Sequence, residues 1–261
     1  EVIVVNDSST DNSLEVASSF QDERIHIYTK ENEGVSAARN YGIMHAKYDY
    51  IAFLDADDIW ESDYLECQKK LIGTYPDAGI YSTAFYSLEK GKRKLRNVLI
   101  NEHIHFLVHD YFKESVMNGL SICWTSSLCL KKEVIKEIPM FRVGIKRGED
   151  LDLWLRIALN YDVAYLNLPK VFYRTGLSDS LTSDYSKNGE FPYYEWFNFT
   201  SESSYYRKYV ILVVYIHAKN AFIHHDYDTC LAELWSVKTI AWRFKWAERL
   251  LLLVISWIKS K

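Results

Sequence analysis

Residues 50–58 read Tyr-Ile-Ala-Phe-Leu-Asp-Ala-Asp-Asp, an apolar run that ends in a cluster of carboxylates. The short apolar run Tyr50–Leu54 predicts a buried strand. Asp55, Asp57 and Asp58 repel one another, so their cluster costs stability unless a cation offsets the charge. In an extended chain Asp55 and Asp57 would point the same way. Two interpretations stay open, a divalent-metal site or a solvated acidic turn capping a helix at Trp60–Glu66.

Outward from this stretch, the first 90 residues alternate apolar runs with amphipathic stretches. This order predicts an α/β fold with a mostly parallel, doubly wound sheet flanked by helices, in which ligands collect at the carboxyl ends of the strands. The expected strands are Val2–Val5, Arg24–Tyr28, Tyr50–Leu54 and Gly79–Ser87. The expected helices are Asn12–Phe20, Gly34–Ala46 and Asp63–Tyr75, the last with Leu65, Leu71 and Ile72 on its apolar face.

The second half of the chain has a different pattern. We expect a basic, glycine-containing turn at Lys90–Arg96 and strands at Ser121–Leu130, Val163–Leu168 and Lys170–Arg174, the last two joined at Pro169. The expected helices are Lys131–Glu137 and Glu149–Asn160, and the second has Leu151, Trp154, Leu155, Ala158 and Leu159 on one face. Composition changes near residue 186, where aromatic residues cluster. We therefore divide the chain into a catalytic domain, residues 1–185, and an aromatic-rich helical tail, residues 186–261, with helices near Ser204–His224 and Thr229–Ile258.

The bulk composition excludes some classes of protein. The chain has 261 residues, of which 48% are apolar and 25% charged, as in a folded globular protein. Its net charge of −4 gives no reason to expect a nucleic-acid partner. Four scattered Cys without a CxxC argue against a zinc site or a disulfide framework and suit a reducing, cytoplasmic compartment. The sequence opens inside a strand without Met, so we expect further sequence before Glu1.

Two polar motifs follow the first two strands. Asn6–Asp11 is a run of Asn, Asp, Ser and Thr that could hold a nucleoside through hydrogen bonds, or could cap a helix through Ser8 or Ser9. Gly34–Asn40 begins with glycine and small residues, which permit close approach at a helix start. Arg39 would there point toward a phosphate or base, or else lie in solvent.

Two further motifs lie later in the chain. Glu149 and Asp150 open the Trp154 helix and could supply a general base, or could complement the helix dipole as caps. Arg174 ends a strand close to hydroxyl residues and could neutralise a leaving diphosphate, or could be an ordinary surface arginine.

In their order along the chain, these motifs resemble the family-2 inverting glycosyltransferases of bacterial polysaccharide biosynthesis, which have the GT-A fold. The resemblance rests on residues 4–11, 32–40, 53–60 and 148–150 and covers residues 1–180. The family usually has Asp at the position of Asn6, often has His at the position of Gly176, and has an opening strand that this sequence does not include.

The resemblance implies a reaction and roles for its residues. A sugar would pass from a nucleoside-diphosphate sugar, with uridine as the nucleoside, to an acceptor hydroxyl by a metal-dependent inverting displacement. Asp150, supported by Glu149, would be the catalytic base. Asp57 would bind Mn²⁺ or Mg²⁺, with Asp55 as a second metal ligand that also touches the ribose. The implied donor-binding residues are Asn6, Asp7, Ser9, Arg39, Asn40, Asp55, Ala56 and Arg174.

Other functions compete with this one. A sugar nucleotidyltransferase would favour a glycine-rich basic loop after its first strand, which residues 6–11 lack. A carbohydrate- or lipid-binding module of the same fold, catalytically weakened, is the non-enzyme alternative. The acceptor would be a saccharide or a lipid-linked sugar, and we expect its specificity to lie in residues 88–130 and 175–200.

The end of the chain carries an aromatic stripe. One face of the expected last helix holds Trp235, Trp242, Trp246, Leu250, Leu253 and Trp257, and residues 238–261 include six basic residues and one acidic residue. The helix could lie in the membrane interface at the inner face of the plasma membrane, or pack on the catalytic domain or on a second subunit in a homodimer. The apolar run Leu250–Ile258 is too short to span a bilayer.

Overall fold

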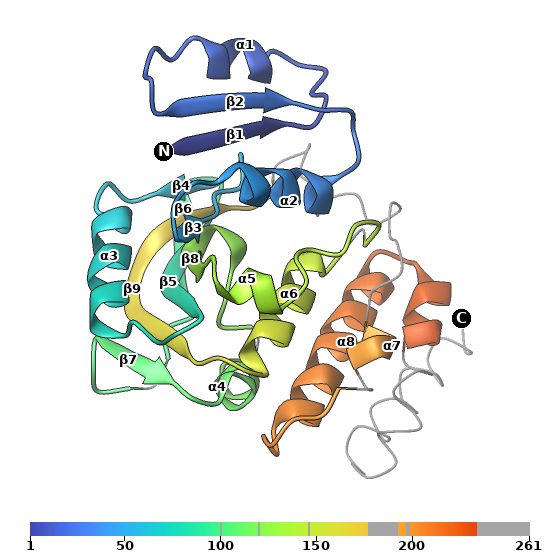
Figure 1. Cartoon of the computed structure of the whole chain (residues 1–261). Coiled ribbons are helices and arrows are strands. Elements are labelled where there is room, and N and C mark those ends of the chain that lie inside the picture. Colours follow the sequence, from blue (N-terminus) through green and yellow to red (C-terminus); the bar gives the residue numbers. More distant parts are fainter. Residues whose placement is uncertain (100, 120, 146, 177–192, 197–198, 234–261) are drawn as a thin grey trace. The chain divides into compact units, whose positions relative to one another are not determined.

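The computed structural model describes residues 1–99, 101–119, 121–145, 147–176, 193–196 and 199–233 (Figure 1). The chain forms two compact units. The first comprises Glu1–His109 and Cys123–Thr175. The second includes Asp110–Ile122 and the described residues 193–196 and 199–233. The predicted boundary at residue 185 falls outside the described residues, and the sequence did not assign Asp110–Ile122 to the second unit.

The elements of the first unit follow one another much as predicted. In chain order they are β1 (Val2–Asn6), α1 (Ser13–Ser18), β2 (Ile25–Thr29), α2 (Val35–His45), β3 (Tyr50–Ala52), β4 (Ile59–Trp60), α3 (Tyr64–Thr74), β5 (Ile80–Glu89), β6 (Lys92–Arg96), β7 (His105–Val108), η1 (Thr125–Ser127), β8 (Leu128–Lys131), α5 (Val134–Glu137), α6 (Glu149–Ala158) and β9 (Val163–Arg174).

The strands form two sheets. β1 and β2 pair in parallel, and a seven-stranded sheet has the order β3-β8-β5-β9-β4, with β6 on β5 and β7 on β9 (Figure 1). The α/β class with flanking helices is confirmed, but the expectation of a mostly parallel sheet is wrong in detail. Among the described strands, only the β1–β2 and β5–β9 pairs are parallel, because β4, β6, β7 and β8 return antiparallel to their neighbours.

The chain passes through Pro169 without leaving the strand. Two strands joined at this proline were predicted, but β9 is continuous. Its register against β5 shifts there, from Thr83↔Leu166 to Ala84↔Pro169. An irregularity of this kind accommodates a residue that has no amide to donate.

Residues 121–130 were predicted to be one strand, and this is wrong for most of their length. The structure has the 3₁₀ turn η1 followed by the shorter β8. Hydroxyl groups favour the turn, since the Ser127 Oγ donates to the Trp124 carbonyl (2.9 Å).

Helices α3 and α6 bury different faces from those expected. In α3, Tyr64 and Leu71 are buried whereas Leu65, predicted to be apolar-facing, is 59% exposed, because the i, i+4, i+7 row that includes Gln68 faces the sheet. In α6, Trp154 and Leu155 of the predicted face are buried together with Leu153 and Ile157, whereas the predicted Leu151, Ala158 and Leu159 are only half-buried.

The second unit includes the helices α4 (Tyr111–Asn118), α7 (Tyr193–Trp196) and α8 (Tyr206–Ile223), and residues 227–233 are helical as well. α8 confirms the helix predicted near residues 204–224. α4 packs on α8 through aromatic rings, with Phe112 and Tyr206 centroids 4.8 Å apart and a hydrogen bond of 3.0 Å between the Tyr111 and Tyr209 hydroxyls. In the described part of the chain, none of the helices has the length and apolar character needed to cross a membrane. The predicted aromatic stripe lies beyond residue 233, outside the described residues.

Candidate active site

The acidic run forms a tight turn at the end of β3. The amide of Asp58 donates to the Asp55 carbonyl (2.9 Å), and the amide of Asp55 donates to the Ser126 Oγ (3.0 Å). The run is therefore a turn, whereas the expectation that Asp55 and Asp57 point the same way required an extended chain. Its first residue, Asp55, is held by Ser126 of η1. The alternative interpretation, a cap for a helix at Trp60–Glu66, is also wrong: residues 59–60 are strand β4 and α3 begins at Tyr64.

The three carboxylates of the turn have different surroundings. Asp55 is one-third exposed and accepts from Arg39 (2.7 Å). Asp57 is half-buried, and its carbonyl accepts from the Arg174 Nε. Asp58 is buried and its Oδ1 accepts from the Arg174 amide (3.1 Å). Burial, helped by the charges of Asp55 and Asp57, raises the pKa of Asp58 to about 6.

Arg39, on α2, connects the acidic turn to the start of α6. Its guanidinium donates to Asp55 (2.7 Å) and to the Glu149 Oε1 (2.8 Å), and it lies 5.3 Å from the centre of the Phe141 ring. Burial disfavours its charge, but Asp55 and Glu149 outweigh that effect and raise its pKa. The solvated-arginine interpretation is therefore wrong, because only 12% of the side chain is exposed.

The two carboxylates that open α6 face this arginine. Gly148, at φ 73°, turns the chain into the helix. The Asp150 Oδ2 accepts from the Thr125 hydroxyl (3.1 Å) and its Oδ1 from the Leu151 amide (2.7 Å). Burial raises the pKa of both Glu149 and Asp150; the charge of Asp150 also raises that of Glu149, while Arg39 lowers both. Glu149 bonds the arginine and Asp150 is affected by its charge, and carboxyl groups with perturbed pKa values of this kind are frequent at functional sites.

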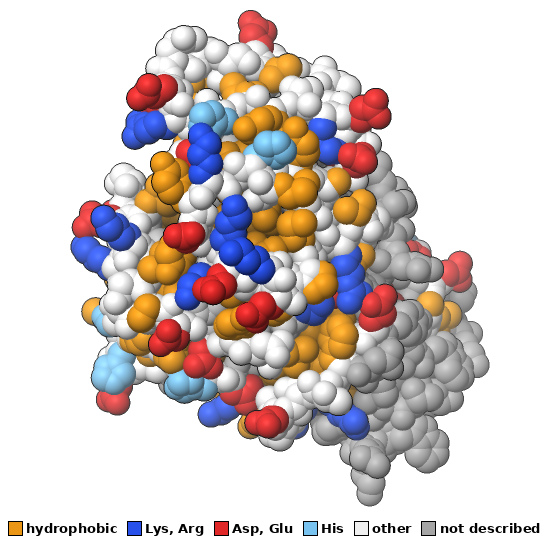
Figure 2. All heavy atoms as spheres, in the orientation of Figure 1, with side chains coloured by type: hydrophobic (Ala, Val, Ile, Leu, Met, Phe, Trp, Pro, Cys, Tyr) orange, Lys and Arg blue, Asp and Glu red, His pale blue; other side chains and the backbone are white. Residues whose placement is uncertain are grey.

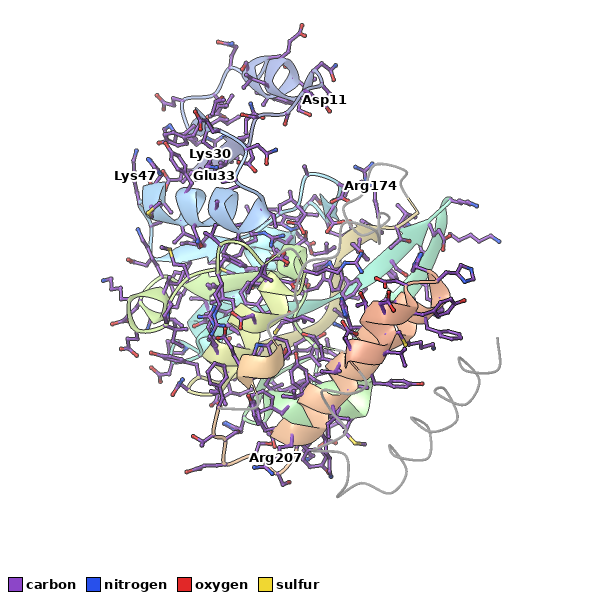
Figure 3. All side chains as sticks on the ribbon, turned by 90° about the vertical axis from the view of Figure 1, so that its right-hand side faces the viewer. Asp11, Lys30, Glu33, Lys47, Arg174 and Arg207 are labelled. Atoms are coloured by element: carbon purple, nitrogen blue, oxygen red, sulfur yellow. The ribbon has the colours of Figure 1, made fainter. Side chains whose placement is uncertain are left out.

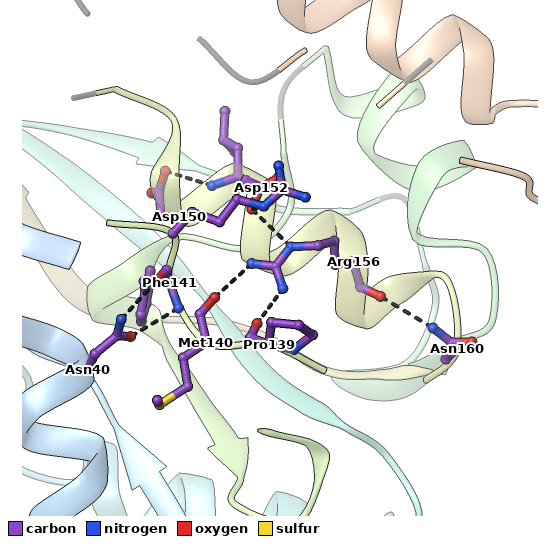
Figure 4. Close-up of polar contacts among 10 residues, drawn as sticks. Asn40, Pro139, Met140, Phe141, Asp150, Asp152, Arg156 and Asn160 are labelled. Atoms are coloured by element: carbon purple, nitrogen blue, oxygen red, sulfur yellow. Dashed lines mark hydrogen bonds and ion pairs between the residues drawn. The ribbon is translucent and has the colours of Figure 1, made fainter. Parts of the chain in front are cut away.

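Hydrogen bonds fix the helix that carries this pair to the segment that precedes it. Asp152 is fully buried and binds Arg156 (2.9 Å), whose guanidinium also donates to the Met140 carbonyl (3.0 Å) and the Pro139 carbonyl (Figure 4). Asn40 bonds the Phe141 main chain on both sides, donating to its carbonyl (2.7 Å) and accepting from its amide (3.0 Å). The donor contact of Asn40 stays a prediction, and in the structure its amide group ties α2 to the segment that precedes α6.

The motif after β1 holds the loop between β2 and α2. The Asp7 carboxylate accepts from Lys30 (2.8 Å) and from the amides of Glu33 (3.1 Å) and Gly34 (2.8 Å). Figure 3 labels Lys30 and Glu33 at this loop, where they form an ion pair (2.7 Å). Burial opposes the charge of Asp7, but Lys30 and the two amides outweigh it and lower the pKa.

The rest of this motif lies beside Asp7. Asn6 is buried and accepts from the Ser9 amide (3.0 Å). The predicted capping by Ser8 or Ser9 is wrong, since α1 begins at Ser13, whose amide donates to Asp11 (3.0 Å).

The structure brings some predicted residues together and reveals others. Asp55, Arg39, Glu149 and Asp150 form one connected cluster, and Arg174 joins the acidic turn from β9. Ala56 is exposed at the tip of the turn. Sequence reasoning missed the roles of Thr125 and Ser126, which hold Asp150 and Asp55. The hydroxyl-rich run of residues 125–127 was the available signal.

The carboxylates of the acidic turn would hold a cation only together with a bound substrate. Within the described residues, no group of three or more His, Cys, Asp or Glu side chains is arranged to hold a metal. Asp57 is half-buried in the turn, and Asp55 already accepts from Arg39. Mg²⁺ is commonly held by one or two carboxylates and completed by substrate phosphates, and Asp57 with Asp55 fits that pattern.

A mixed α/β sheet with an acidic turn at a strand end places the chain in the GT-A class of folds. The crystal structure of S. aureus TarS 1–349 in complex with UDP-GlcNAc superposes with a TM-score of 0.69 over 90% of this chain and 70% of that one, at 16% identity. The sequence model of the family "Glycosyl transferase family 2" matches residues 1–138, and the chain belongs to this family.

Curated relatives extend the comparison. GlyA of Streptococcus pneumoniae is 31% identical over 67% of this chain and 26% of its own length. TuaG of Bacillus subtilis, a glycosyltransferase assigned to teichuronic acid biosynthesis, is 30% identical over 63% of each protein. The chain thus spans less than two thirds of the length of these relatives.

Proposed function

We propose that this chain transfers a sugar from a UDP-linked donor to an acceptor hydroxyl, by a metal-dependent displacement that inverts the anomeric carbon, in the synthesis of a surface polysaccharide or glycolipid. Membership in glycosyl transferase family 2 supports the reaction class. The UDP-GlcNAc bound by TarS supports the donor, and the assignment of TuaG to teichuronic acid supports the product class.

The observation that carries the proposal is the cluster around Arg39. One guanidinium contacts Asp55 (2.7 Å) from the acidic turn and Glu149 (2.8 Å) from the start of α6. This contact brings the donor-side carboxylates beside Asp150, although the two motifs lie almost 100 residues apart in the sequence. A transferase needs this juxtaposition because acceptor and donor must meet at one carbon.

In the proposed step, Asp150 accepts the acceptor hydroxyl proton. The acceptor oxygen then forms a bond to the anomeric carbon, and the bond from that carbon to the diphosphate oxygen breaks, releasing UDP. The raised pKa of Asp150 brings its basicity closer to neutral pH, where a general base works best. Thr125 fixes the orientation of this carboxylate through its hydroxyl.

The donor side must neutralise the departing diphosphate. Mn²⁺ or Mg²⁺, held by Asp57 and Asp55, would supply positive charge to it. Arg174 adds a cationic group at the same turn, where its main chain and side chain bond Asp58 and Asp57. Asn6, Asp7 and Ser9 form the proposed nucleoside end, in which Asp7 shapes the loop of residues 30–34.

The test of the donor site is calorimetric titration of UDP with and without Mn²⁺. We expect Mn²⁺ to strengthen UDP binding and the Asp57→Ala variant to lose at least tenfold in affinity, because a metal ligand is removed. Glu61→Ala, on a carboxylate outside the turn, is the matched control and should bind as the wild type does. A UDP affinity of the wild type that does not change with Mn²⁺ would contradict the proposal and favour a binding module.

A further inference from the structure

A strongly basic hairpin continues β5 into β6. The turn residues Lys90 (φ 49°) and Gly91 (φ 77°) both have positive φ, as a two-residue hairpin turn of type I′ requires. Five of the seven residues 90–96 are basic, and all seven are exposed. None of the five forms an ion pair with any residue that the structure describes. On the face drawn in Figure 2, by contrast, acidic and basic side chains are interspersed.

The hairpin belongs to the strand end that carries the active site. Across the sheet, Leu88 pairs with Arg93 on one side and with Arg174 on the other, and the Thr175 amide donates to the Leu88 carbonyl (2.9 Å). Arg174 in turn bonds the acidic turn through Asp57. Figure 3 labels Arg174 at this end of the sheet.

One face of the hairpin leads to the catalytic carboxylate. Ser87 pairs with Lys94 in β6 and with Tyr173 in β9, so these three side chains share one face of the sheet. The Tyr173 ring lies 4.4 Å from that of Trp124, and both pack beside the buried Phe85. Trp124 precedes Thr125, which donates to Asp150.

The aromatic rings and the charges therefore form a strip. It runs from Asp150 through Trp124 and Tyr173 to Lys94, the last two being about 10 Å apart at two strand spacings. Both rings are half-buried, and the Trp124 Nε1 is a buried donor without a hydrogen-bond partner among the described residues. Half-buried aromatic rings suit a sugar ring, and exposed lysines without an ion pair among the described residues suit anionic groups.

We propose that the basic hairpin, residues 90–96, binds the phosphate or carboxylate groups of an anionic glycan acceptor while Trp124 and Tyr173 hold the sugar nearest Asp150. This inference rests on the proposed function and adds the charge class of its acceptor. The glycan is favoured over a membrane surface because the rings connect the charges directly to the catalytic carboxylate.

The test measures binding of end-labelled glycans by fluorescence anisotropy. The probes are oligogalacturonate, which carries carboxylates, poly(glycerol phosphate), which carries phosphates, and neutral dextran of similar length. The K90Q/K92Q/K94Q variant is compared with K47Q/K69Q/K136Q, which removes the same charge from exposed lysines elsewhere. UDP binding with Mn²⁺ is measured on each protein, and vesicles of phosphatidylglycerol are a further probe.

We expect the wild type to bind at least one anionic glycan tenfold more tightly than dextran, and the hairpin variant to lose that preference while the control keeps it. The preferred anion identifies the charged group. Equal binding of anionic and neutral glycans, equal losses in both variants, or hairpin dependence seen only with vesicles would each overturn the inference. If UDP binding fails while hairpin-dependent glycan binding persists, the proposed transfer is wrong and the anionic-glycan surface stands.

Discussion

Arg39 is the residue on which the cluster depends. Its guanidinium is the shared partner of Asp55 and Glu149, and Asp150 lies next to Glu149 in the chain. Without that positive charge, carboxylates from two distant segments would face one another in a partly buried site. The positive charge of the arginine thus offsets the repulsion between the acid groups.

Replacing Arg39 tests this role. Arg39→Ala should lower the free energy of unfolding by about 3 kcal/mol or more, because it leaves buried carboxylates unpaired. Arg39→Lys should lower it less, since a lysine keeps the charge but lacks the planar guanidinium that reaches the two carboxylates through separate nitrogens. Urea denaturation measures both. Equal stability of Arg39→Ala and the wild type would show that the guanidinium does not stabilise this cluster.

Asp58 predicts a pH effect whose sign is definite. Its pKa is about 6 in the folded protein and near 3.8 when unfolded, so between these values the folded chain binds more protons. The contribution of Asp58 to stability is therefore largest below about pH 4 and is lost as pH rises through 6. Asn keeps the oxygen that accepts from the Arg174 amide but does not titrate.

The measurement is the free energy of unfolding of the wild type and Asp58→Asn at pH 4, 5, 6 and 7, without metal. We expect the wild type to lose stability relative to the variant by roughly 1–3 kcal/mol over this range. A difference that stays constant, or that grows in favour of the wild type as pH rises, would show that Asp58 is not held protonated.

At the scale of elements, α2 is tied to the segment that precedes α6 through the Asn40–Phe141 bonds. The Asn40 amide bonds the Phe141 main chain on both sides, so its side chain is held against that segment. Asn40→Ala should therefore lower the free energy of unfolding by about 1–3 kcal/mol and leave the UDP dissociation constant within twofold of the wild type. Loss of UDP affinity without loss of stability would restore the donor-binding role predicted from the sequence.

The elements near the donor side were predictable because their signals are local. Apolar runs and turn residues located β1, β2, β3, α2 and α6 within a few residues. The break at Pro169 was predicted wrongly because the register shift between β5 and β9 that accommodates the proline is a tertiary feature. Leu65 misled for the same kind of reason: only the neighbouring sheet shows which face of α3 is buried.

The candidate site was predictable as a set of motifs but not as a set of contacts. The sequence identified Arg39, Asp55, Glu149 and Asp150 separately. It could not show that Arg39 joins two of them, because that contact spans 110 positions. Nor could it separate Asn40, which has a structural role, from its neighbour Arg39, because both lie in one motif and only the fold shows their partners.

At the scale of the molecule, the central claim is that the acidic turn and the start of α6 work as one transferase site. The chain belongs to a glycosyltransferase family over residues 1–138, and Asp150 lies outside that matched range. Its role therefore rests on the geometry that places it beside the Arg39 cluster. A measurement on Asp150 tests the claim where it depends most on the structure.

That measurement is the rate of UDP release from UDP-GlcNAc, UDP-glucose and UDP-galactose with Mn²⁺, for the wild type and Asp150→Asn. We predict that the wild type releases UDP from at least one donor and that the variant is at least about 100-fold slower, with UDP affinity unchanged, since a general base contributes on that order. An Asp150→Asn variant that keeps its rate, or that loses UDP binding in parallel, would contradict the account.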